Sequence, residues 1–212
     1  LDEFLKEQPE FSNGTYKPSS FEGLIEFKNV SFTYPNSGIT ALKDVSFTIE
    51  PGNNLGVLGK TGAGKSTIAA LMVRQYDPTE GAILVDGVDI KNWDLPTLKS
   101  YLGWVPQEAF LFSDTIANNI AFGMDTLEIA AVKSAAKAAG VHENIMGFDK
   151  QYLTKVGERG ITLSGGQKQR VSIARALIKS PKVIILDDCL SAVDTETEEQ
   201  ILSNLRKATE NL

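Results

Sequence analysis

Apolar and polar residues alternate with a period of two between Leu24 and Ile49. Ile25 and Phe27 alternate with the charged Glu26 and Lys28, and polar residues separate Val45, Phe47 and Ile49 from one another. Such alternation sends successive side chains to opposite faces of a sheet. The pattern therefore predicts two half-buried antiparallel strands.

Turn signals interrupt this β pattern. The apolar run Ile83–Val85 is followed directly by Asp86-Gly87, a pair that favours the tight turn of a β-hairpin. Pro51-Gly52 predicts another turn further upstream. The first third of the chain is therefore expected to form a β layer.

Continuous apolar runs and helical periods predict the remaining elements. Leu55–Leu58 predicts a buried strand, and Val183–Leu186 predicts a parallel strand buried on both faces. The pattern between 93 and 180 is mostly helical, and Thr195–Thr209 predicts a further helix. Strands and helices in this order indicate the α/β fold class.

Length, charge and composition narrow the function classes. The 212 residues fit one large domain, or one domain with an inserted subdomain. The net charge of -6, without a long run of Lys or Arg, disfavours nucleic acid as a partner. Cys189 is the only cysteine, which excludes an internal disulfide. His142 is the only histidine, and we expect it at an exposed helical position without a catalytic role.

The stretch from Gly59 to Thr67 has the clearest chemistry. It reads Gly-Lys-Thr-Gly-Ala-Gly-Lys-Ser-Thr, between an apolar run and a helical pattern that begins at Ile68. Glycines let the backbone turn tightly and direct its N–H groups at an anion, and the next helix adds the positive end of its dipole. Lys65 supplies a charge for the β- and γ-phosphates of a nucleotide, and the hydroxyl of Ser66 can ligate Mg²⁺. The stretch predicts a phosphate-binding loop.

Two further stretches carry polar groups where phosphate chemistry would use them. Asp187 and Asp188 follow the apolar run Val183–Leu186, and a carboxylate at such a strand end can hold Mg²⁺. Ser164 and Gln167 form a capping-box pattern around two glycines, which indicates a helix start open to an anion. Alone, the capping box would more often be only a capped helix.

In this order and spacing, the three stretches resemble the ATP-binding cassette (ABC) ATPases. Gly59–Thr67 resembles their Walker A loop, Leu163–Gln167 the signature motif, and Val183–Asp188 the Walker B strand. The resemblance implies a P-loop NTPase core with a parallel sheet, an antiparallel β subdomain and an inserted α-helical subdomain at about 93–180. It also implies an ATP-binding domain over 21–212, and a linker from a preceding membrane domain over 1–20.

The resemblance also implies roles for single residues. Tyr34 resembles the aromatic residue that stacks on adenine, although it could be a core strand aromatic. Gln107 resembles the glutamine that senses Mg²⁺ and the attacking water. The implied ATP contacts are Tyr34, Gly59, Thr61, Gly62, Ala63, Gly64, Lys65, Ser66, Thr67 and Gln107. The implied contacts to a partner's ATP are Ser164, Gly165, Gly166 and Gln167. The implied metal ligands are Ser66, Gln107 and Asp187, and the implied catalytic residues are Asp188, Gln107 and Lys65.

Two loops point to the assembly that the resemblance implies. Ser191–Asp194 resembles the loop that crosses the interface between two cassettes, and Val156–Gly160 resembles the exporter segment that touches the membrane domains. The expected setting is the cytoplasmic face of a membrane. The expected partners are a second cassette and the transmembrane domain of the same parent chain, without nucleic acid.

The chain departs from the family pattern at Asp188. ABC ATPases usually carry Glu there, the base that orients the attacking water, and Asp is one methylene shorter. We therefore predict that ATP binds but is hydrolysed slowly, and that the natural partner is a different cassette with Glu at this position. The alternatives are a nucleotide-gated structural half with little hydrolysis and a soluble ABC ATPase unrelated to transport. The family's switch histidine is expected beyond Leu212.

Overall fold

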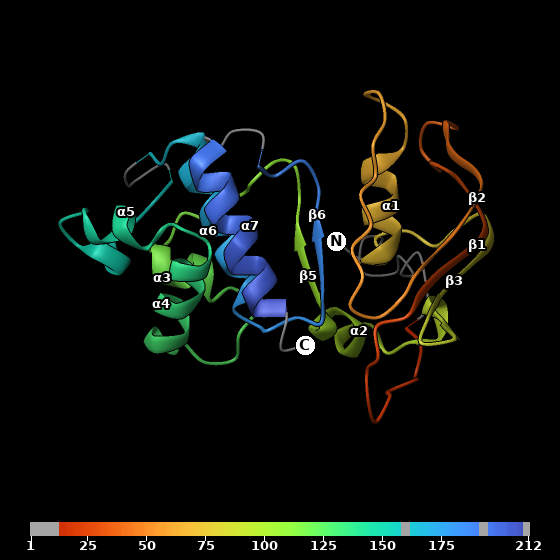
Figure 1. The fold of residues 1–212 in the computed structure, drawn as a ribbon, viewed down its shortest axis with the longest axis horizontal. Helices are drawn as coiled ribbons and strands as arrows, with labels where there is room; N and C mark the ends of the chain where they lie inside the picture. Colours follow the sequence, from red (N-terminus) through yellow and green to blue (C-terminus); the bar gives the residue numbers. More distant parts are fainter. Residues whose placement is uncertain (1–12, 158–161, 191–194, 210–212) are drawn as a thin grey trace, which may run out of the picture. The chain divides into compact units, whose positions relative to one another are not determined.

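The computed structural model describes residues 13–157, 162–190 and 195–209. Three expectations lie wholly or partly outside these residues: the start of the linker, the end of Val156–Gly160, and Ser191–Asp194. The chain divides into two compact units, Leu1–Lys99 and Ser100–Leu212. Figure 1 shows the elements of each unit coloured along the sequence.

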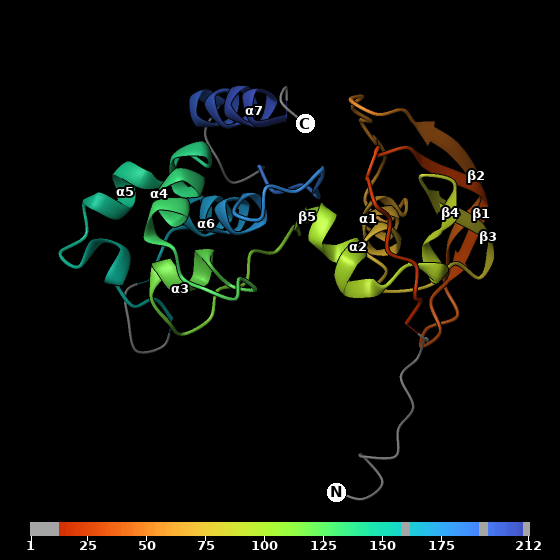
Figure 2. The same ribbon diagram turned by 90° about the horizontal axis from the view of Figure 1, so that it is seen from below.

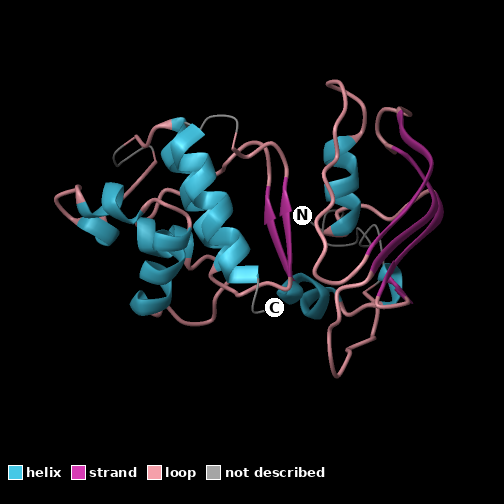
Figure 3. Ribbon diagram, viewed as in Figure 1, coloured by secondary structure: helices cyan, strands magenta, loops and turns pink. Residues whose placement is uncertain are grey.

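Strands dominate the first unit and helices the second, as Figure 3 shows by colour. The first unit contains β1 (Ile25–Thr33), β2 (Thr40–Ile49), α1 (Lys65–Met72), β3 (Glu80–Val85), β4 (Val88–Asp89), η2 (Ile90–Asn92) and most of α2 (Leu95–Tyr101). The second unit contains β5 (Leu102–Val105), α3 (Ile116–Ile120), α4 (Ile129–Ala138), α5 (His142–Met146), η3 (Gln151–Leu153), α6 (Gly165–Leu177), β6 (Val183–Leu186) and α7 (Thr195–Thr209).

The sheet of the first unit confirms the predicted strands and hairpin. Its four strands run in the order β2-β1-β3-β4, and each neighbouring pair is antiparallel. Asp86 and Gly87 join β3 to β4 with φ angles of 50° and 76°, as a tight hairpin turn requires. Ile25, Phe27 and Ile83 are buried in the core of this unit. Helix α1 lies on one side of the sheet (Figures 1 and 2).

The prediction of a buried strand at Leu55–Leu58 is wrong. Residues 53–60 carry no regular secondary structure, and the side chain of Leu58 is 97% exposed. A strand exists only through its ladder of hydrogen bonds, and the described sheet of this unit contains no partner for the segment. The prediction of burial rested on apolar composition alone, and the segment is exposed and irregular because no described strand pairs with it.

The second unit contains a short parallel sheet and a helical core. Strands β5 and β6 pair in parallel, with Leu102 opposite Val183 and Val105 opposite Leu186. Helix α6 packs against α3 and α4, and Ile201 of α7 is buried in the same apolar core. This mixture of antiparallel, parallel and helical parts is the predicted α/β class.

Three details of the second unit differ from the expectations drawn from the sequence. Leu102–Val105 is a strand inside the region predicted to be mostly helical, because its pairing with β6 outweighs local preference. Strand β6 is parallel as predicted but only half-buried, since β5 is its only described partner strand. His142 is also not exposed: its side chain is 17% accessible, and Nδ1 lies 2.7 Å from the hydroxyl oxygen of Tyr152.

In the described part of the chain, no helix is both long and apolar enough to span a bilayer.

Candidate functional site

The stretch Gly59–Thr67 runs into a helix as predicted, but α1 begins at Lys65, three residues earlier than the predicted start at Ile68. Gly62 and Gly64 have φ angles of +81° and +88°, which glycine adopts without strain. A Cβ on Gly64 would lie 2.5 Å from the carbonyl oxygen of Ala41, so the position also lacks room for a side chain. Gly64 is the N-cap of α1 and makes no side-chain bond to the helix start. The helix start is thus left to bind an anion through its N–H groups.

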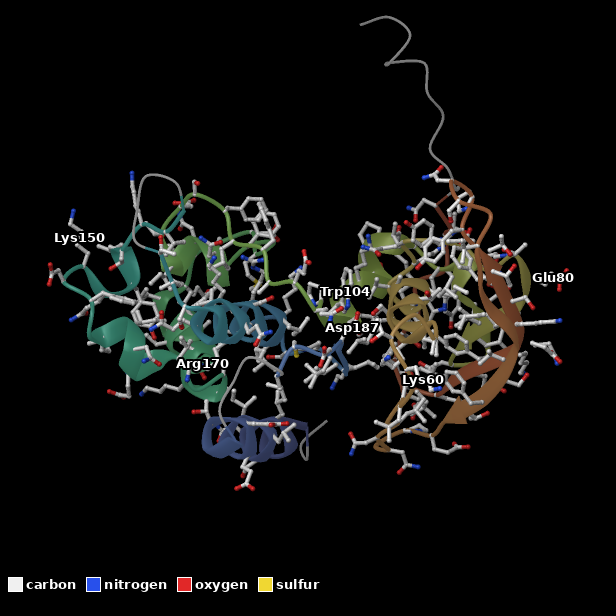
Figure 4. All side chains as sticks on the ribbon, turned by 90° about the horizontal axis from the view of Figure 1, so that it is seen from above. Lys60, Glu80, Trp104, Lys150, Arg170 and Asp187 are labelled. Carbon is white, nitrogen blue, oxygen red and sulfur yellow. The ribbon has the colours of Figure 1, made fainter. Side chains whose placement is uncertain are left out.

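Lys65 lies over this loop. Its Nζ donates hydrogen bonds to the carbonyl oxygens of Gly59, at 2.8 Å, and Lys60, at 3.0 Å. Figure 4 labels Lys60 in the loop ahead of α1. Phosphate oxygens would offer the same ammonium stronger, charge-assisted bonds. The lysine is therefore already placed where a nucleotide phosphate would meet it.

Tyr34 is tied to the phosphate loop through its hydroxyl. This hydroxyl lies 2.9 Å from Oγ1 of Thr67, in the first turn of α1. The ring packs edge-on against Phe32 and Tyr76, with centroids 4.9 and 5.5 Å away. The structure therefore brings Tyr34 to the loop, and its adenine-stacking role stays a prediction.

Gln107, Asp187 and Asp188 meet in the second unit at the carboxyl ends of β5 and β6. Parallel strands end at the same sheet edge, and Gln107 follows β5 while the two aspartates follow β6. The backbone N–H of Asp187 donates to the carbonyl of Val105 at 3.0 Å. Nε2 of Gln107 donates to Oδ2 of Asp188 at 3.1 Å. Figure 4 labels Asp187 beside Trp104 of β5. Polar residues far apart in sequence thus form one cluster.

Asp188 has a left-handed backbone conformation, with φ at 47°. Asp tolerates this region better than most residues with a side chain. Its carboxylate is exposed and is engaged by Gln107. The short side chain is therefore held close to its own strand end.

The predicted capping box at the start of α6 is confirmed. Gln167 N–H donates to the hydroxyl oxygen of Ser164 at 3.2 Å, and Ser164 N–H donates to Oε1 of Gln167 at 3.0 Å. Val171 and Ala174 bury the apolar face of the helix. The backbone of Gly165 stays exposed at this helix start. The arrangement suits a capped helix, and it also leaves the first turn approachable by an anion.

Oxygen donors of the kind that Mg²⁺ prefers occur in both units. Among the described residues, no group of three or more His, Cys, Asp or Glu could hold a metal ion alone. Mg²⁺ typically uses one or two protein oxygens together with phosphates and waters. The hydroxyl of Ser66 and the carboxylate of Asp187 are ligands of that hard, oxygen-bearing kind.

The second unit carries an aromatic patch, defined by Phe110, Phe112 and Phe122, that was not predicted from the sequence. Phe112 and Phe122 stack with centroids 4.4 Å apart, and Phe110 packs edge-on against Phe112 at 5.0 Å. Phe110 is 65% exposed and Phe122 53%. The sequence signal for this patch was the presence of these three phenylalanines within the stretch that follows Gln107.

Arg175 of α6 contacts the rings and the backbone of this patch. Its guanidinium lies 5.7 Å from the ring centroids of Phe112 and Phe122. It also donates to the carbonyl oxygens of Phe110, at 2.9 Å, and Asn119, at 2.7 Å. Burial lowers the pKa of Arg175, yet a guanidinium stays charged in proteins. Hydrogen bonds and cation–π contacts thus fix the aromatic patch.

Cys189 follows the carboxylate cluster, and its side chain is buried. Its side chain is 1% exposed, and burial raises the pKa of the thiol to about 11. Because the thiolate is the reactive form, we expect native Cys189 to alkylate about two orders of magnitude more slowly than a free cysteine at neutral pH. Iodoacetamide labelling with and without urea tests this, and rapid labelling of the folded protein would refute it.

A glycine-built phosphate loop and a carboxylate cluster at parallel strand ends define a P-loop nucleotide-binding domain. The sequence matches the ABC transporter family over residues 42–191. The chain therefore belongs to the ABC transporter family, and it is an ATPase domain of that family.

Relatives of known type support this assignment. The chain is 46% identical over 211 residues to ATP-binding cassette sub-family B member 6 of Mus musculus, covering 99% of this chain and 25% of that protein. It is 45% identical over 191 residues to the putative multidrug export ATP-binding/permease protein YgaD of Bacillus subtilis, covering 90% of this chain and 33% of that protein. A solved bacterial Atm1-family ABC exporter with ATP bound superposes with a TM-score of 0.90 at 41% identity, over 98% of this chain and 37% of that one. The chain thus spans between a quarter and two fifths of these relatives.

Proposed function

We propose that this chain binds and hydrolyses ATP as the cassette of an ABC exporter. It would pair head-to-tail with a second cassette on the cytoplasmic face of a membrane. The observation that carries the proposal is the loop Gly59–Thr67, where Gly64 leaves the helix start uncapped and Lys65 lies over the backbone. The relatives named as exporters support the transport role.

Each polar group has a role in this proposal. Lys65 and the loop N–H groups hold the phosphates, and Tyr34 stacks on the adenine ring. Ser66 and Asp187 hold Mg²⁺, which neutralises phosphate charge when bound. Gln107 and Asp188 orient the attacking water. Catalysis of phosphoryl transfer rests mainly on such positioning and charge stabilisation.

The signature helix serves the neighbouring site. Ser164–Gln167 would contact the ATP held by the partner cassette, through the approachable first turn of α6.

Asp188 weakens the site that this chain itself holds, because its side chain is one methylene shorter than Glu and is bonded to Gln107. A pairing with a different cassette that carries Glu would keep one fully competent site. The same residue favours a second candidate, a nucleotide-gated structural half with little turnover of its own.

Hydrolysis by defined pairs tests the proposed function. We expect the parent protein in lipid vesicles to hydrolyse ATP faster with a Glu-bearing partner cassette than with itself, by about tenfold or more. The control is a partner whose own signature serine is replaced, which would disable only the site on this chain. A mixed pair no faster than the self-associated protein would contradict the heterodimer.

The aromatic patch is the surface that we assign to the membrane domain of the parent chain. Exposed large apolar groups gathered in one place indicate an interaction site. Arg175 holds these rings in a fixed arrangement, so the surface is formed before its partner binds. Phe110 and Phe112 follow Gln107 closely in the sequence, so a partner bound at the patch would lie near the predicted water sensor along the chain.

Photo-cross-linking tests that surface. A photoreactive phenylalanine analogue at position 110 of the parent protein is expected to cross-link to its membrane domain. The same analogue in place of Glu143, whose side chain is 94% exposed, is expected to give several-fold less product. Equal yields from the two positions would refute the assignment.

A further inference from the structure

The segment Asn13–Leu24, named here the clasp, is bound along residues 86–95 of the first unit. Tyr16 makes two backbone bonds: its N–H donates to the carbonyl of Asn92 at 2.9 Å, and its carbonyl accepts from the N–H of Asp94 at 3.0 Å. The Tyr16 ring packs edge-on against the fully buried Trp93, at 5.2 Å between centroids. This part of the predicted linker is therefore fixed to the domain surface.

Asn13 binds the start of α2. Its Oδ1 accepts a hydrogen bond from the N–H of Leu95 at 2.7 Å, and its Nδ2 donates to Oδ1 of Asp94 at 3.3 Å. Asp94 in turn accepts from the N–H and the hydroxyl of Thr97, at 3.1 and 2.6 Å. These bonds satisfy N–H groups that a helix start leaves without partners. The clasp thus supplies part of the cap of α2.

Close packing leaves no room for a side chain at Gly14. A Cβ there would lie 2.1 Å from the carbonyl carbon and oxygen of Asn92. Because these are backbone atoms, a larger residue could fit only if the two segments separated. Gly14 therefore offers a single position at which the clasp can be released.

A second attachment holds the other end of the clasp. The carboxylate of Asp86, in the β3–β4 turn, accepts hydrogen bonds from three successive N–H groups, those of Glu22, Gly23 and Leu24, at 2.9, 2.8 and 2.9 Å. Hydrogen bonds to an ionised acceptor are stronger than neutral ones. Fixing the backbone of a segment costs conformational entropy, which a slack linker would not lose. The two attachments therefore hold the segment in one path.

We propose that the clasp fixes the preceding part of the parent chain to this domain, so that nucleotide-driven movement of the domain reaches the membrane domain. Asn13 and Gly14 are positioning residues in this scheme and make no contact with ATP. The inference rests on the proposed function, which places a membrane domain in the parent chain. The clasp caps α2, and α2 runs directly into β5, after which Gln107 follows. The clasp is thus bound to α2, the helix that precedes β5 and the predicted Mg²⁺ sensor Gln107 in the chain.

Gly14→Ala in the full parent protein tests the proposal, with ATP, Mg²⁺ and orthovanadate as the probe. In the unmodified protein, the probe is expected to change tryptic cleavage of the membrane domain. Gly14→Ala is expected to keep ATP affinity within about twofold and to lose that change. The neighbouring Thr15→Ala is the matched control, because Thr15 is exposed, and it is expected to keep both.

Exchanging the side chains of Asn13 and Asp94 distinguishes a positioning role of the clasp from a general loss of protein stability. Asn13→Asp alone would place two carboxylates against each other and is expected to reduce the cleavage change severalfold. Combining it with Asp94→Asn restores a donor and an acceptor at this contact and is expected to recover most of the change. Recovery of thermal stability without recovery of the cleavage change would overturn the proposal.

The remaining outcomes are also distinct. An unchanged cleavage response in Gly14→Ala would overturn the clasp, and so would a parallel loss of ATP affinity, which indicates a merely structural role. Failure of the unmodified protein to bind ATP would instead refute the proposed function.

Discussion

Replacing Lys65 by Ala is expected to weaken ATP binding by about a hundredfold or more. Hydrogen bonds to charged groups each contribute about 1.5–3 kcal/mol, and each 1.4 kcal/mol is about a factor of ten in affinity. Lys65 is already placed over the loop by its bonds to Gly59 and Lys60, so little rearrangement precedes phosphate binding. Isothermal titration of the variant and the unmodified protein with ATP and Mg²⁺ measures the loss.

The control for Lys65 is Lys43→Ala, which removes the same charge from an exposed position on β2. This variant is expected to bind ATP as the unmodified protein does. Micromolar binding retained by Lys65→Ala would contradict the assignment of the phosphate loop. An equal loss in both variants would attribute the effect to net charge rather than to the loop.

Lengthening the carboxylate by Asp188→Glu is expected to raise ATP hydrolysis by about tenfold or more in the parent protein. A general base must lie within hydrogen-bond reach of the water, and a displacement of about 1 Å can cost roughly a hundredfold in rate. In the structure, Asp188 is occupied by Gln107 at 3.1 Å and stays close to its strand end. Steady-state phosphate release, measured with the candidate partner present, gives the comparison.

Asp125→Glu is the matched control, because it adds the same methylene at an exposed position of the second unit. Its turnover is expected to be unchanged. Turnover that is unchanged or lower in Asp188→Glu would show that Asp188 already serves as the base, or that another step limits the site. The left-handed backbone at Asp188, with φ at 47°, is a cost that the longer side chain must also bear.

Elements whose determinants are local could be predicted from the sequence. Period-two alternation identified β1 and β2, Asp86-Gly87 identified the hairpin, and Ser164 with Gln167 identified the start of α6. Each of these depends on neighbours only a few residues away. The phosphate-loop prediction rests on the same kind of local signal, the spacing of its glycines, lysine and hydroxyl residues.

Features that depend on distant partners could not be predicted. Strand β5 exists because it pairs with β6, and Leu55–Leu58 is not a strand because no described partner pairs with it in its unit. The bond between Gln107 and Asp188 joins residues 81 positions apart. The resemblance implied only a linker over 1–20, which includes Asn13 and Tyr16, whereas the attachment of these two residues depends on Trp93 and Asp94. Such pairings need tertiary structure.

The central claim is that the site on this chain binds ATP but hydrolyses it slowly. Following the ATP bound at its own phosphate loop tests this claim most directly. Radiolabelled ATP would be bound to the parent protein with Mg²⁺, chased with unlabelled ATP, and analysed as ATP or ADP over time. We predict stoichiometric binding with most of the label recovered as ATP over many seconds. Conversion to ADP at about 10 per second, an ordinary turnover for enzymes, would contradict the account of a weakened site.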